Sequence, residues 1–195
     1  MERELVLTGI GGQGIQLAAQ VLARAAIAEG RQVQMFGSYG GMMRGGNTEA
    51  TLVLADGAIE APPTVTDTWS AIFMHHDFSA PTRAKLRAGS LVFVNTSLFE
   101  GEFEGAFDHD EYRVVELAAT DIAVDLGNIM TASMVMLGAY VAATDIVTLD
   151  SVDTAIAASL PAYRSQHVAR NVDAVRAGFD VAPRAIVSAW NGVPA

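Results

Sequence analysis

Gly9-Ile10-Gly11-Gly12-Gln13-Gly14 is the segment that decides how this chain folds. It follows the apolar run Leu5-Val6-Leu7-Thr8 and precedes an alanine-rich amphipathic stretch, an order that predicts a strand, a tight turn and a helix. Glycine permits positive φ and exposes backbone N–H groups, and the N-terminus of the following helix attracts negative charge. The segment is therefore a candidate binding site for a phosphate, a pyrophosphate or a carboxylate.

Two other interpretations of this segment stay open. Gly9, Gly11 and Gly14 satisfy the glycine pattern of dinucleotide-binding folds, so a stand-alone Rossmann-type dinucleotide-binding protein is the main alternative. That pattern also requires an acidic residue at the end of the second strand, where this chain has Gln32-Val33-Gln34-Met35-Phe36, with Glu29 lying before the strand. In the simplest interpretation, the glycines serve only the tight turn between strand and helix.

A second glycine-rich segment, Ser38-Tyr39-Gly40-Gly41-Met42-Met43-Arg44-Gly45-Gly46-Asn47, precedes a strand-like run over residues 48–54. Arg44 carries a planar, permanently charged guanidinium that suits carboxylate or phosphate, in a setting kept open by its glycine neighbours. We expect Arg44 to contact a ligand or a partner. The alternative is a solvated arginine on a flexible loop.

Together, the two segments resemble the gamma subunit of 2-oxoacid:ferredoxin oxidoreductases. The resemblance rests on Gly-Ile-Gly-Gly-Gln-Gly-Ile, on Ser-Tyr-Gly with Arg-Gly-Gly, and on landmarks that follow in order across nearly the whole chain: Ala55-Asp56-Gly57-Ala58-Ile59, Pro62, Val94-Asn95-Thr96-Ser97, Asn128, Met134-Val135-Met136-Leu137-Gly138-Ala139, Asn171 and Gly178. The Ser-Tyr-Gly motif resembles that of chains acting with 2-oxoglutarate, while pyruvate and aryl-2-oxoacids stay open.

The resemblance implies a subunit of a hetero-oligomeric enzyme that converts a 2-oxoacid, coenzyme A and an oxidised acceptor into an acyl-CoA, CO₂ and a reduced acceptor. In such complexes thiamine diphosphate, Mg²⁺ and [4Fe-4S] clusters lie in partner subunits, and ferredoxin or a flavin/NAD acceptor subunit takes the electrons. The gamma subunit is associated with coenzyme A access and with assembly. A purely architectural role for the glycine segments is a further alternative.

We expect no catalytic residue and no metal ligand in this chain. The expected cofactor-binding residues border coenzyme A and come from the two glycine segments and one strand end: Gly9, Gly11, Gly12, Gln13, Gly14, Ser38, Tyr39, Arg44, Gly45, Gly46, Asn47 and Asn95. Asn95 follows the apolar strand at residues 91–94, where it either lines the same crevice or caps the next turn.

The composition agrees with these implications. The chain has no cysteine, so it cannot ligate an iron–sulfur cluster through thiolates. Its nearest approach to a thiamine-binding motif is Ala55-Asp56-Gly57, in a turn-like setting. A net charge of −10, with 12 Lys and Arg residues spread along the chain, disfavours nucleic-acid binding. The first residues lead straight into a strand without a secretory leader, so we expect a cytoplasmic protein.

The alternation of strand and helix patterns predicts one α/β domain over residues 1–195, with a Rossmann-like, mostly parallel sheet and flanking helices. Strands are expected at 4–8, 32–36, 48–54, 69–74, 90–94 and 112–116, and helices at 14–29, 80–88, 118–124, 128–143, 148–160 and 163–177. The last two helices are predicted to form a C-terminal hairpin packed on the sheet. The segment 179–195 is a candidate docking tail for a neighbour, with wrapping on its own domain as the alternative.

Residues 126–144 carry no charge over 19 positions, which raises the question of a membrane span. Polar residues within the segment and acidic flanks at Asp125 and Asp145 favour a buried or interface helix instead. Apolar residues occur all the way round this helix. We therefore expect cover on several sides, with part of it supplied by another subunit.

His75, His76 and Asp77 follow the apolar run Ala71-Ile72-Phe73-Met74 and are candidates for metal binding or proton transfer. Adjacent histidines on a strand point to opposite faces, so we expect that the two cannot easily share one ion. No role is assigned to these three residues.

Overall fold

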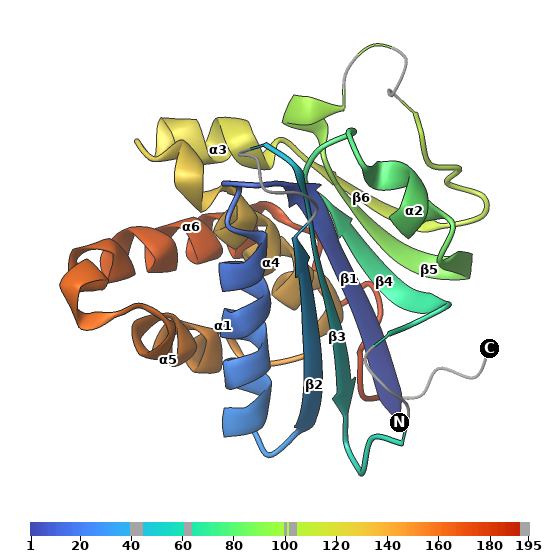
Figure 1. Ribbon diagram of the computed structural model, residues 1–195, viewed down its shortest axis with the longest axis horizontal. Helices are drawn as coiled ribbons and strands as arrows, with labels where there is room; N and C mark the ends of the chain where they lie inside the picture. The colour runs from blue at the N-terminus through green and yellow to red at the C-terminus, as the bar shows by residue number, and fades with distance from the viewer. Residues whose placement is uncertain (40–44, 61–63, 100, 102–104, 192–195) are drawn as a thin grey trace.

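The computed structural model describes residues 1–39, 45–60, 64–99, 101 and 105–191 and shows a six-stranded sheet with helices on both faces (Figure 1). The strands are β1 (Glu2–Ile10), β2 (Gln32–Tyr39), β3 (Asn47–Ala55), β4 (Thr68–Phe73), β5 (Leu86–Asn95) and β6 (Arg113–Leu117). The helices are α1 (Ile15–Ala28), α2 (Ser79–Arg83), α3 (Ala119–Asp125), α4 (Ala132–Thr144), α5 (Leu149–Ser159) and α6 (Val168–Val181), with 3-10 turns η1 (Thr96–Leu98), η3 (Ile129–Thr131) and η4 (Ala162–His167).

The strand order is β2-β3-β1-β4-β5-β6, and β3 alone among the described strands runs against the others. The prediction of a mostly parallel α/β sheet is confirmed. In dinucleotide-binding sheets, the second strand lies beside the first, runs parallel to it and holds the ribose at its carboxyl end. In this chain, the antiparallel strand β3 occupies that position beside β1. The edge next to the glycine turn is therefore formed by the start of β3, at Asn47 and Thr48.

Helices α1 and α4 cover one face of the sheet and enclose the larger core, which takes Leu5 and Leu7 from β1 and Phe93 from β5. Tyr140 of α4 is fully buried there, with its ring edge-on to Phe93 and its hydroxyl 3.0 Å from Ser70 Oγ. Burial raises the pKa of Tyr140 well above its ordinary value. This tyrosine fixes α4 against the centre of the sheet.

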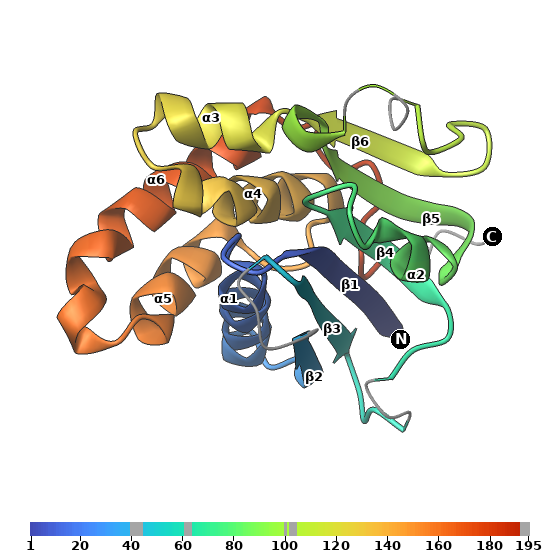
Figure 2. The ribbon, with the colours of Figure 1, turned by 45° about the horizontal axis from the view of Figure 1, so that its top comes forward.

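The C-terminal hairpin forms an outer layer and does not pack on the sheet as expected. α5 packs on α1 and α6 packs on α4, and Figure 2 shows both lying away from the strands. The reason is that α1 and α4 already occupy this face of the sheet. A groove is left between α1 and the hairpin, and the candidate site lies there.

Every residue of α4 is buried within the chain itself, so the expected cover from another subunit is not needed. Two glycines allow the close packing of α4 against α6. A Cβ added at Gly138 would lie 1.9 Å from the carbonyl oxygen of Val175, and one added at Gly178 would lie 1.8 Å from that of Val135. No helix in the described part of the chain is long and apolar enough to cross a bilayer.

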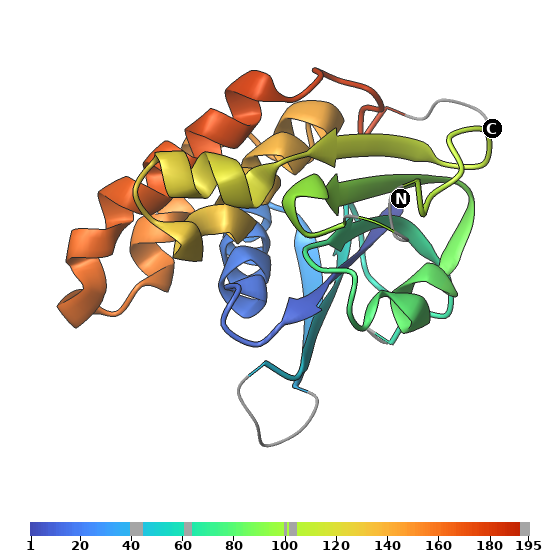
Figure 3. The same cartoon turned by 90° about the horizontal axis from the view of Figure 1, so that it is seen from above.

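The opposite face of the sheet carries a smaller core with α2 beside it (Figure 3). The helix expected at 80–88 ends at Arg83, and the chain enters β5 at Leu86, which pairs with Thr68 of β4. Lys85 is drawn onto the sheet by an ion pair with Glu49 of β3, 2.8 Å long. Strand pairing therefore overrides the helical propensity of this segment.

The described part of the C-terminal tail packs on its own domain. The backbone N–H groups of Ala185, Val187 and Ala189 donate to the last carbonyls of α4, those of Ala142, Ala143 and Thr144. Trp190 donates its indole N–H to the carbonyl of Ile146, and the Arg31 guanidinium stacks on its ring. The tail thereby satisfies a helix end that would otherwise lack partners. Residues 192–195 lie outside the described residues.

Candidate functional site

The first glycine segment forms the predicted strand–turn–helix connection. Gly12 has φ +105°, and Gly14 has φ +80° as the residue that precedes α1. Gln13 braces the turn: its side-chain oxygen accepts from the Ile10 backbone N–H at 2.8 Å, and its amide donates to the carbonyl of Met74. Gly9 leaves room for this brace, since a Cβ there would lie 2.5 Å from the Gln13 side-chain oxygen. Gly9 and Gln13 thus support the turn, while Gly12 and Gly14 form its surface.

The N-terminus of α1 keeps its positive end open. No side chain caps it, and no acidic residue lies in its first turn. The first intrahelical bond of the ladder runs from the Ala18 N–H to the carbonyl of Gly14, so the N–H groups of residues 15–17 precede the helical ladder. These groups, together with the helix dipole, favour an anion at this point.

The second glycine segment lies beside the first. The Gly11 N–H donates to the carbonyl of Gly46 at 2.8 Å, and Asn47 pairs with Ile10 where β3 begins. Gly45 has φ +86°, and Ser38 is exposed near the end of β2. Tyr39 ends β2, but its side chain and residues 40–44, including Arg44, lie outside the described residues.

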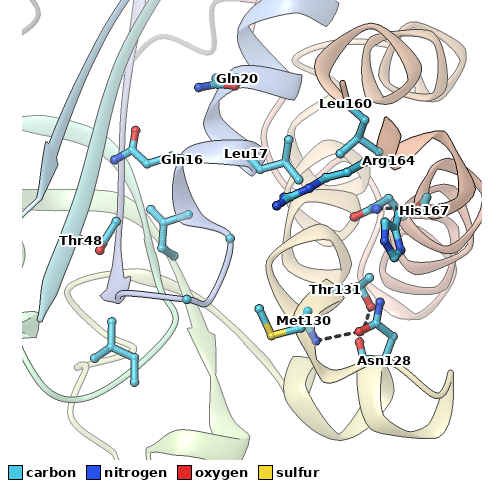
Figure 4. Close-up of a pocket in the computed structure, with 15 residues that line it drawn as sticks. Gln16, Leu17, Gln20, Thr48, Asn128, Met130, Thr131, Leu160, Arg164 and His167 are labelled. Atoms are coloured by element: carbon cyan, nitrogen blue, oxygen red, sulfur yellow. Dashed lines mark hydrogen bonds between the residues drawn. The ribbon is translucent and has the colours of Figure 1, made fainter. Parts of the chain in front are cut away.

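A pocket of about 580 Å³ opens between the glycine turn, α1, η3 and the η4–α6 segment (Figure 4). Of the predicted site residues, Gly12 and Gly14 line it. The other lining residues are Ile10, Ile15, Gln16, Leu17, Gln20, Thr48, Asn128, Met130, Thr131, Leu160, Arg164, His167 and Asn171. The pocket has the size range of small-molecule sites, with polar groups set in an apolar wall.

Sequence reasoning missed Arg164 and His167, which lie in η4 across the pocket from α1 (Figure 4). Asn171 is held behind them by a 2.7 Å hydrogen bond from its amide to the His167 carbonyl. The sequence contained one feature that could have drawn attention to Arg164. Residues 114–163 contain no lysine or arginine, so Arg164 is the first basic side chain after a long stretch without any. Its position between two amphipathic segments suggested only a helix connection.

The comparison with known proteins places the chain in a family. The sequence pattern of the pyruvate ferredoxin/flavodoxin oxidoreductase family matches residues 4–181. This chain belongs to that family. The match includes the glycine turn, the start of β3 and both helices that flank the pocket.

Relatives of similar length carry oxidoreductase subunit names. The 2-oxoglutarate synthase subunit KorC of Methanothermobacter marburgensis is 30% identical over 93% of this chain and 97% of its own length. The common gamma subunit of the pyruvate/ketoisovalerate oxidoreductases of Thermococcus litoralis is 28% identical over 91% and 95%. The structure of a keto/oxoacid ferredoxin oxidoreductase gamma subunit from Geobacter sulfurreducens PCA aligns with TM-score 0.76 and 26% identity, covering 92% of this chain and 95% of that one.

A larger enzyme shares the fold. The 2-oxoglutarate:ferredoxin oxidoreductase of Magnetococcus marinus, solved with 2-oxoglutarate, coenzyme A and succinyl-CoA bound, aligns with TM-score 0.77 at 15% identity. The alignment covers 94% of this chain and 32% of that one. The stand-alone dinucleotide-binding alternative gains no support from the family match or from the antiparallel β3.

In this member of the oxidoreductase family, Asn95 is a buried residue that hydrogen-bonds to the start of helix α3. It is fully buried, its amide donates to the Met74 carbonyl and to Thr120 Oγ1, and its oxygen accepts the Thr120 N–H at the start of α3. The Met74 carbonyl therefore joins Asn95 to Gln13 of the glycine turn. Neither expectation for Asn95 is met: its side chain makes no cap hydrogen bond to η1, the turn that follows it, and Asn95 does not line the pocket.

His75, His76 and Asp77 lie on one side of the chain, so the expectation of opposite faces is wrong. β4 ends at Phe73, and the histidine rings beyond it lie with centroids 4.4 Å apart. His76 Nδ1 is 2.8 Å from the Leu98 carbonyl, and the Asp77 N–H donates to His75 Nδ1 at 3.0 Å. Burial, and then the neighbouring His76, lower the pKa of His75. One possible ligand atom from each of the three residues lies within 4.8 Å of the others, so the prediction that the histidines cannot easily share one ion is also wrong.

Proposed function

We propose that this chain is the gamma subunit of a hetero-oligomeric 2-oxoacid:acceptor oxidoreductase, which converts a 2-oxoacid, coenzyme A and an oxidised acceptor into an acyl-CoA, CO₂ and a reduced acceptor. The observation that carries this proposal is the family match over residues 4–181, joined to relatives that are matched over nearly their full length. Related gamma subunits share both the length and the fold of this chain.

The redox cofactors belong to partner subunits in this proposal. Without cysteine, the chain offers no thiolate for a [4Fe-4S] cluster. Asp56, in the nearest approach to a thiamine-binding motif, lies at the end of the sheet remote from the glycine turn. The complex would pass its electrons to ferredoxin or to a flavin/NAD acceptor subunit, in the cytoplasm.

The two glycine segments would border the access route of coenzyme A. Three observations support this assignment: the hydrogen bond that joins Gly11 to Gly46, the open N-terminus of α1, and the adjacent pocket. The larger relative of the same fold was solved with coenzyme A bound. The expected contacts to coenzyme A are the backbone of Gly11–Gly14 together with Tyr39 and the stretch Arg44–Asn47.

Arg44→Ala is expected to raise the KM for coenzyme A about ten- to hundredfold in the assembled enzyme, because a charge-assisted contact contributes about 1.5–3 kcal/mol. The half-reaction that forms the thiamine radical should keep its rate. Steady-state kinetics with varied coenzyme A measures the effect, and Arg24→Ala on the exposed side of α1 is the matched control. An unchanged dependence on coenzyme A contradicts the assignment, and loss of assembly instead supports the architectural alternative.

An exposed apolar surface next to the pocket is the candidate contact with a partner subunit. Val124 lies in the last turn of α3 and Leu126 just beyond its end, while Ile129 and Met130 lie in η3. All four side chains are about half exposed. Asp121 and Asp125 are the nearest charged residues in the sequence. A partner with an apolar centre and a basic rim would complement this surface.

Ile129→Asp is expected to weaken assembly of the complex by about tenfold or more, because it places a charge in the buried part of the contact. Ile27→Asp is the matched control: Ile27 is 58% exposed and Ile129 56%, but Ile27 lies at the far end of α1. Size-exclusion chromatography of the reconstituted subunits, with circular dichroism of each variant alone, measures assembly and folding. Equal assembly of both variants would show that the partner binds elsewhere.

A further inference from the structure

The turn formed by His75, His76 and Asp77 follows β4 at the carboxyl edge of the sheet. The two imidazole rings lie with centroids 4.4 Å apart, and the Asp77 carboxylate is within 4 Å of both. One possible ligand atom from each residue lies within 4.8 Å of the others. Two imidazoles and a carboxylate are ligands that Zn²⁺ and related divalent transition metals bind in proteins.

The distances between the Asp77 carboxylate and the two rings fit neighbouring ligands of one ion. Asp77 Oδ1 lies 3.4 Å from His76 Nε2, and Asp77 Oδ2 lies 3.7 Å from His75 Nδ1. Both distances exceed the range of about 2.7–3.2 Å that N–H···O hydrogen bonds have. Zn²⁺ bonds of about 2.0–2.2 Å place the ligands of a tetrahedral site about 3.3–3.6 Å apart. The carboxylate therefore stands close to ligand spacing from both rings.

The hydrogen bond of His76 determines which of its nitrogens can bind a metal. His76 Nδ1 lies 2.8 Å from the carbonyl oxygen of Leu98, and because a carbonyl only accepts, Nδ1 carries the proton. In the neutral ring, Nε2 then has the lone pair, and this nitrogen is the one nearer to Asp77 Oδ1. Metal-binding histidines almost always donate their other ring N–H in this way. The Leu98 carbonyl thus fixes the tautomer and the orientation that a metal site requires.

His75 presents a lone pair at its Nδ1. The backbone N–H of Asp77 donates to this nitrogen at 3.0 Å, so Nδ1 acts as an acceptor and carries no proton. A metal ion bound there replaces this hydrogen bond, and the N–H then donates to water, because Asp77 is an exposed residue. The side chain of His75 is 15% exposed and that of Asp77 is 58% exposed, so the ion would lie at the surface with room for water ligands.

The backbone on both sides holds the turn in place. The Met74 N–H donates to the carbonyl of Thr8 at 2.9 Å, and the Ser79 N–H donates to the carbonyl of His76 at 3.2 Å. Phe78, which closes the turn, has φ +62°, a region that is unfavourable for residues with a side chain. A turn fixed in this way presents its ligands in advance, which lowers the entropic cost of binding an ion.

We propose that His75 Nδ1, His76 Nε2 and a carboxylate oxygen of Asp77 bind one divalent transition-metal ion such as Zn²⁺, with water completing its coordination. The proposal replaces our expectation that the chain contains no metal ligand. It does not rest on the proposed function, because all three ligands come from one turn of this chain. The residue before the turn is Met74, whose carbonyl accepts from Gln13, so the ion would lie next to the support of the glycine turn.

Isothermal titration calorimetry of the untagged, metal-free full chain with Zn²⁺ tests the site. The expected result is one Zn²⁺ per chain with a Kd below about 100 µM, and a loss of affinity of about tenfold or more in His76→Ala. Asp77→Asn should show a similar loss, and its exposed position spares the packing of the fold. His109→Ala is the matched control, because it removes an exposed histidine that lies beside Glu116 instead, and it should bind Zn²⁺ as the wild type does. Circular dichroism of each variant measures folding.

Three results would overturn the site. The first is a Kd for Zn²⁺ above about 100 µM in the wild-type chain, and the second is equal Zn²⁺ affinity of the wild type and Asp77→Asn. The third is equal affinity for Zn²⁺ and Mg²⁺, because Mg²⁺ prefers oxygen ligands and should bind much more weakly to a site with two imidazoles. Failure of the chain to assemble with partners refutes the proposed function but leaves the Zn²⁺ measurement intact.

Discussion

Gly178→Ala is expected to lower the Tm of the isolated chain by roughly 6–12 °C, which corresponds to a loss of about 3 kcal/mol of the free energy of unfolding in a protein of this size. The added Cβ would lie 1.8 Å from the carbonyl oxygen of Val135 and 2.6 Å from its carbonyl carbon. Both are backbone atoms of the fully buried helix α4, so no side-chain rotation can relieve the overlap. Either α6 must move away from α4, or the contact must open.

A loss of stability in Gly178→Ala would be informative, because replacing glycine with alanine in a helix normally stabilises it by about 1 kcal/mol when the position is unconstrained. The packing cost must exceed that gain. Gly57→Ala is the control, since an added Cβ there meets no atom within 4 Å and the residue does not have positive φ. Thermal unfolding followed by circular dichroism compares the two variants, and a wild-type Tm for Gly178→Ala would mean that the α4–α6 contact is looser than described.

Gly14→Ala is expected to cost about 2 kcal/mol or more and to disturb the pocket. A non-glycine residue at φ +80° carries a backbone penalty of about 1–2 kcal/mol. In addition, the new methyl group would lie 2.7 Å from Ser133 Oγ, at the junction of α1 and α4. Chemical denaturation measures the cost, which should appear as a lower midpoint with an unchanged slope.

The double variant Gly14→Ala/Ser133→Ala separates the two causes. Removing the Ser133 hydroxyl should recover the steric part of the loss and leave the backbone part, so the coupling energy of the double-mutant cycle should be about 0.5 kcal/mol or larger. Ser133→Ala alone removes a hydroxyl that has no hydrogen-bond partner and should cost little. Strict additivity of the two substitutions would contradict the contact between Gly14 and Ser133.

The parts of the fold that depend on residues close in the sequence could be predicted from local sequence patterns. The glycine turn was predictable because Gly12 and Gly14 need positive φ between an apolar run and an amphipathic helix. The burial of α4 followed from a helix without a polar face. The mostly parallel sheet followed from the alternation of strands and helices.

Features set by distant parts of the chain were not predictable in this way. α2 ends early where Leu86 pairs with Thr68 and Lys85 pairs with Glu49, and the outer position of the hairpin depends on space already filled by α1 and α4. The side-by-side arrangement of His75 and His76 arises because β4 ends at Phe73, so the alternation of side chains along a strand does not apply to these two residues. Arg164 lines the pocket because α5, which precedes η4 in the chain, packs against α1.

We propose that this chain works as the gamma subunit of a thiamine- and iron–sulfur-dependent oxidoreductase. The most direct test is anaerobic purification of the chain from its native host, with identification of the associated proteins by mass spectrometry and assay of iron and thiamine in the complex. We predict co-purification with a thiamine-binding subunit and with a cysteine-rich, ferredoxin-like subunit. A lone chain without iron or thiamine, above all one that retained a dinucleotide, would contradict the claim.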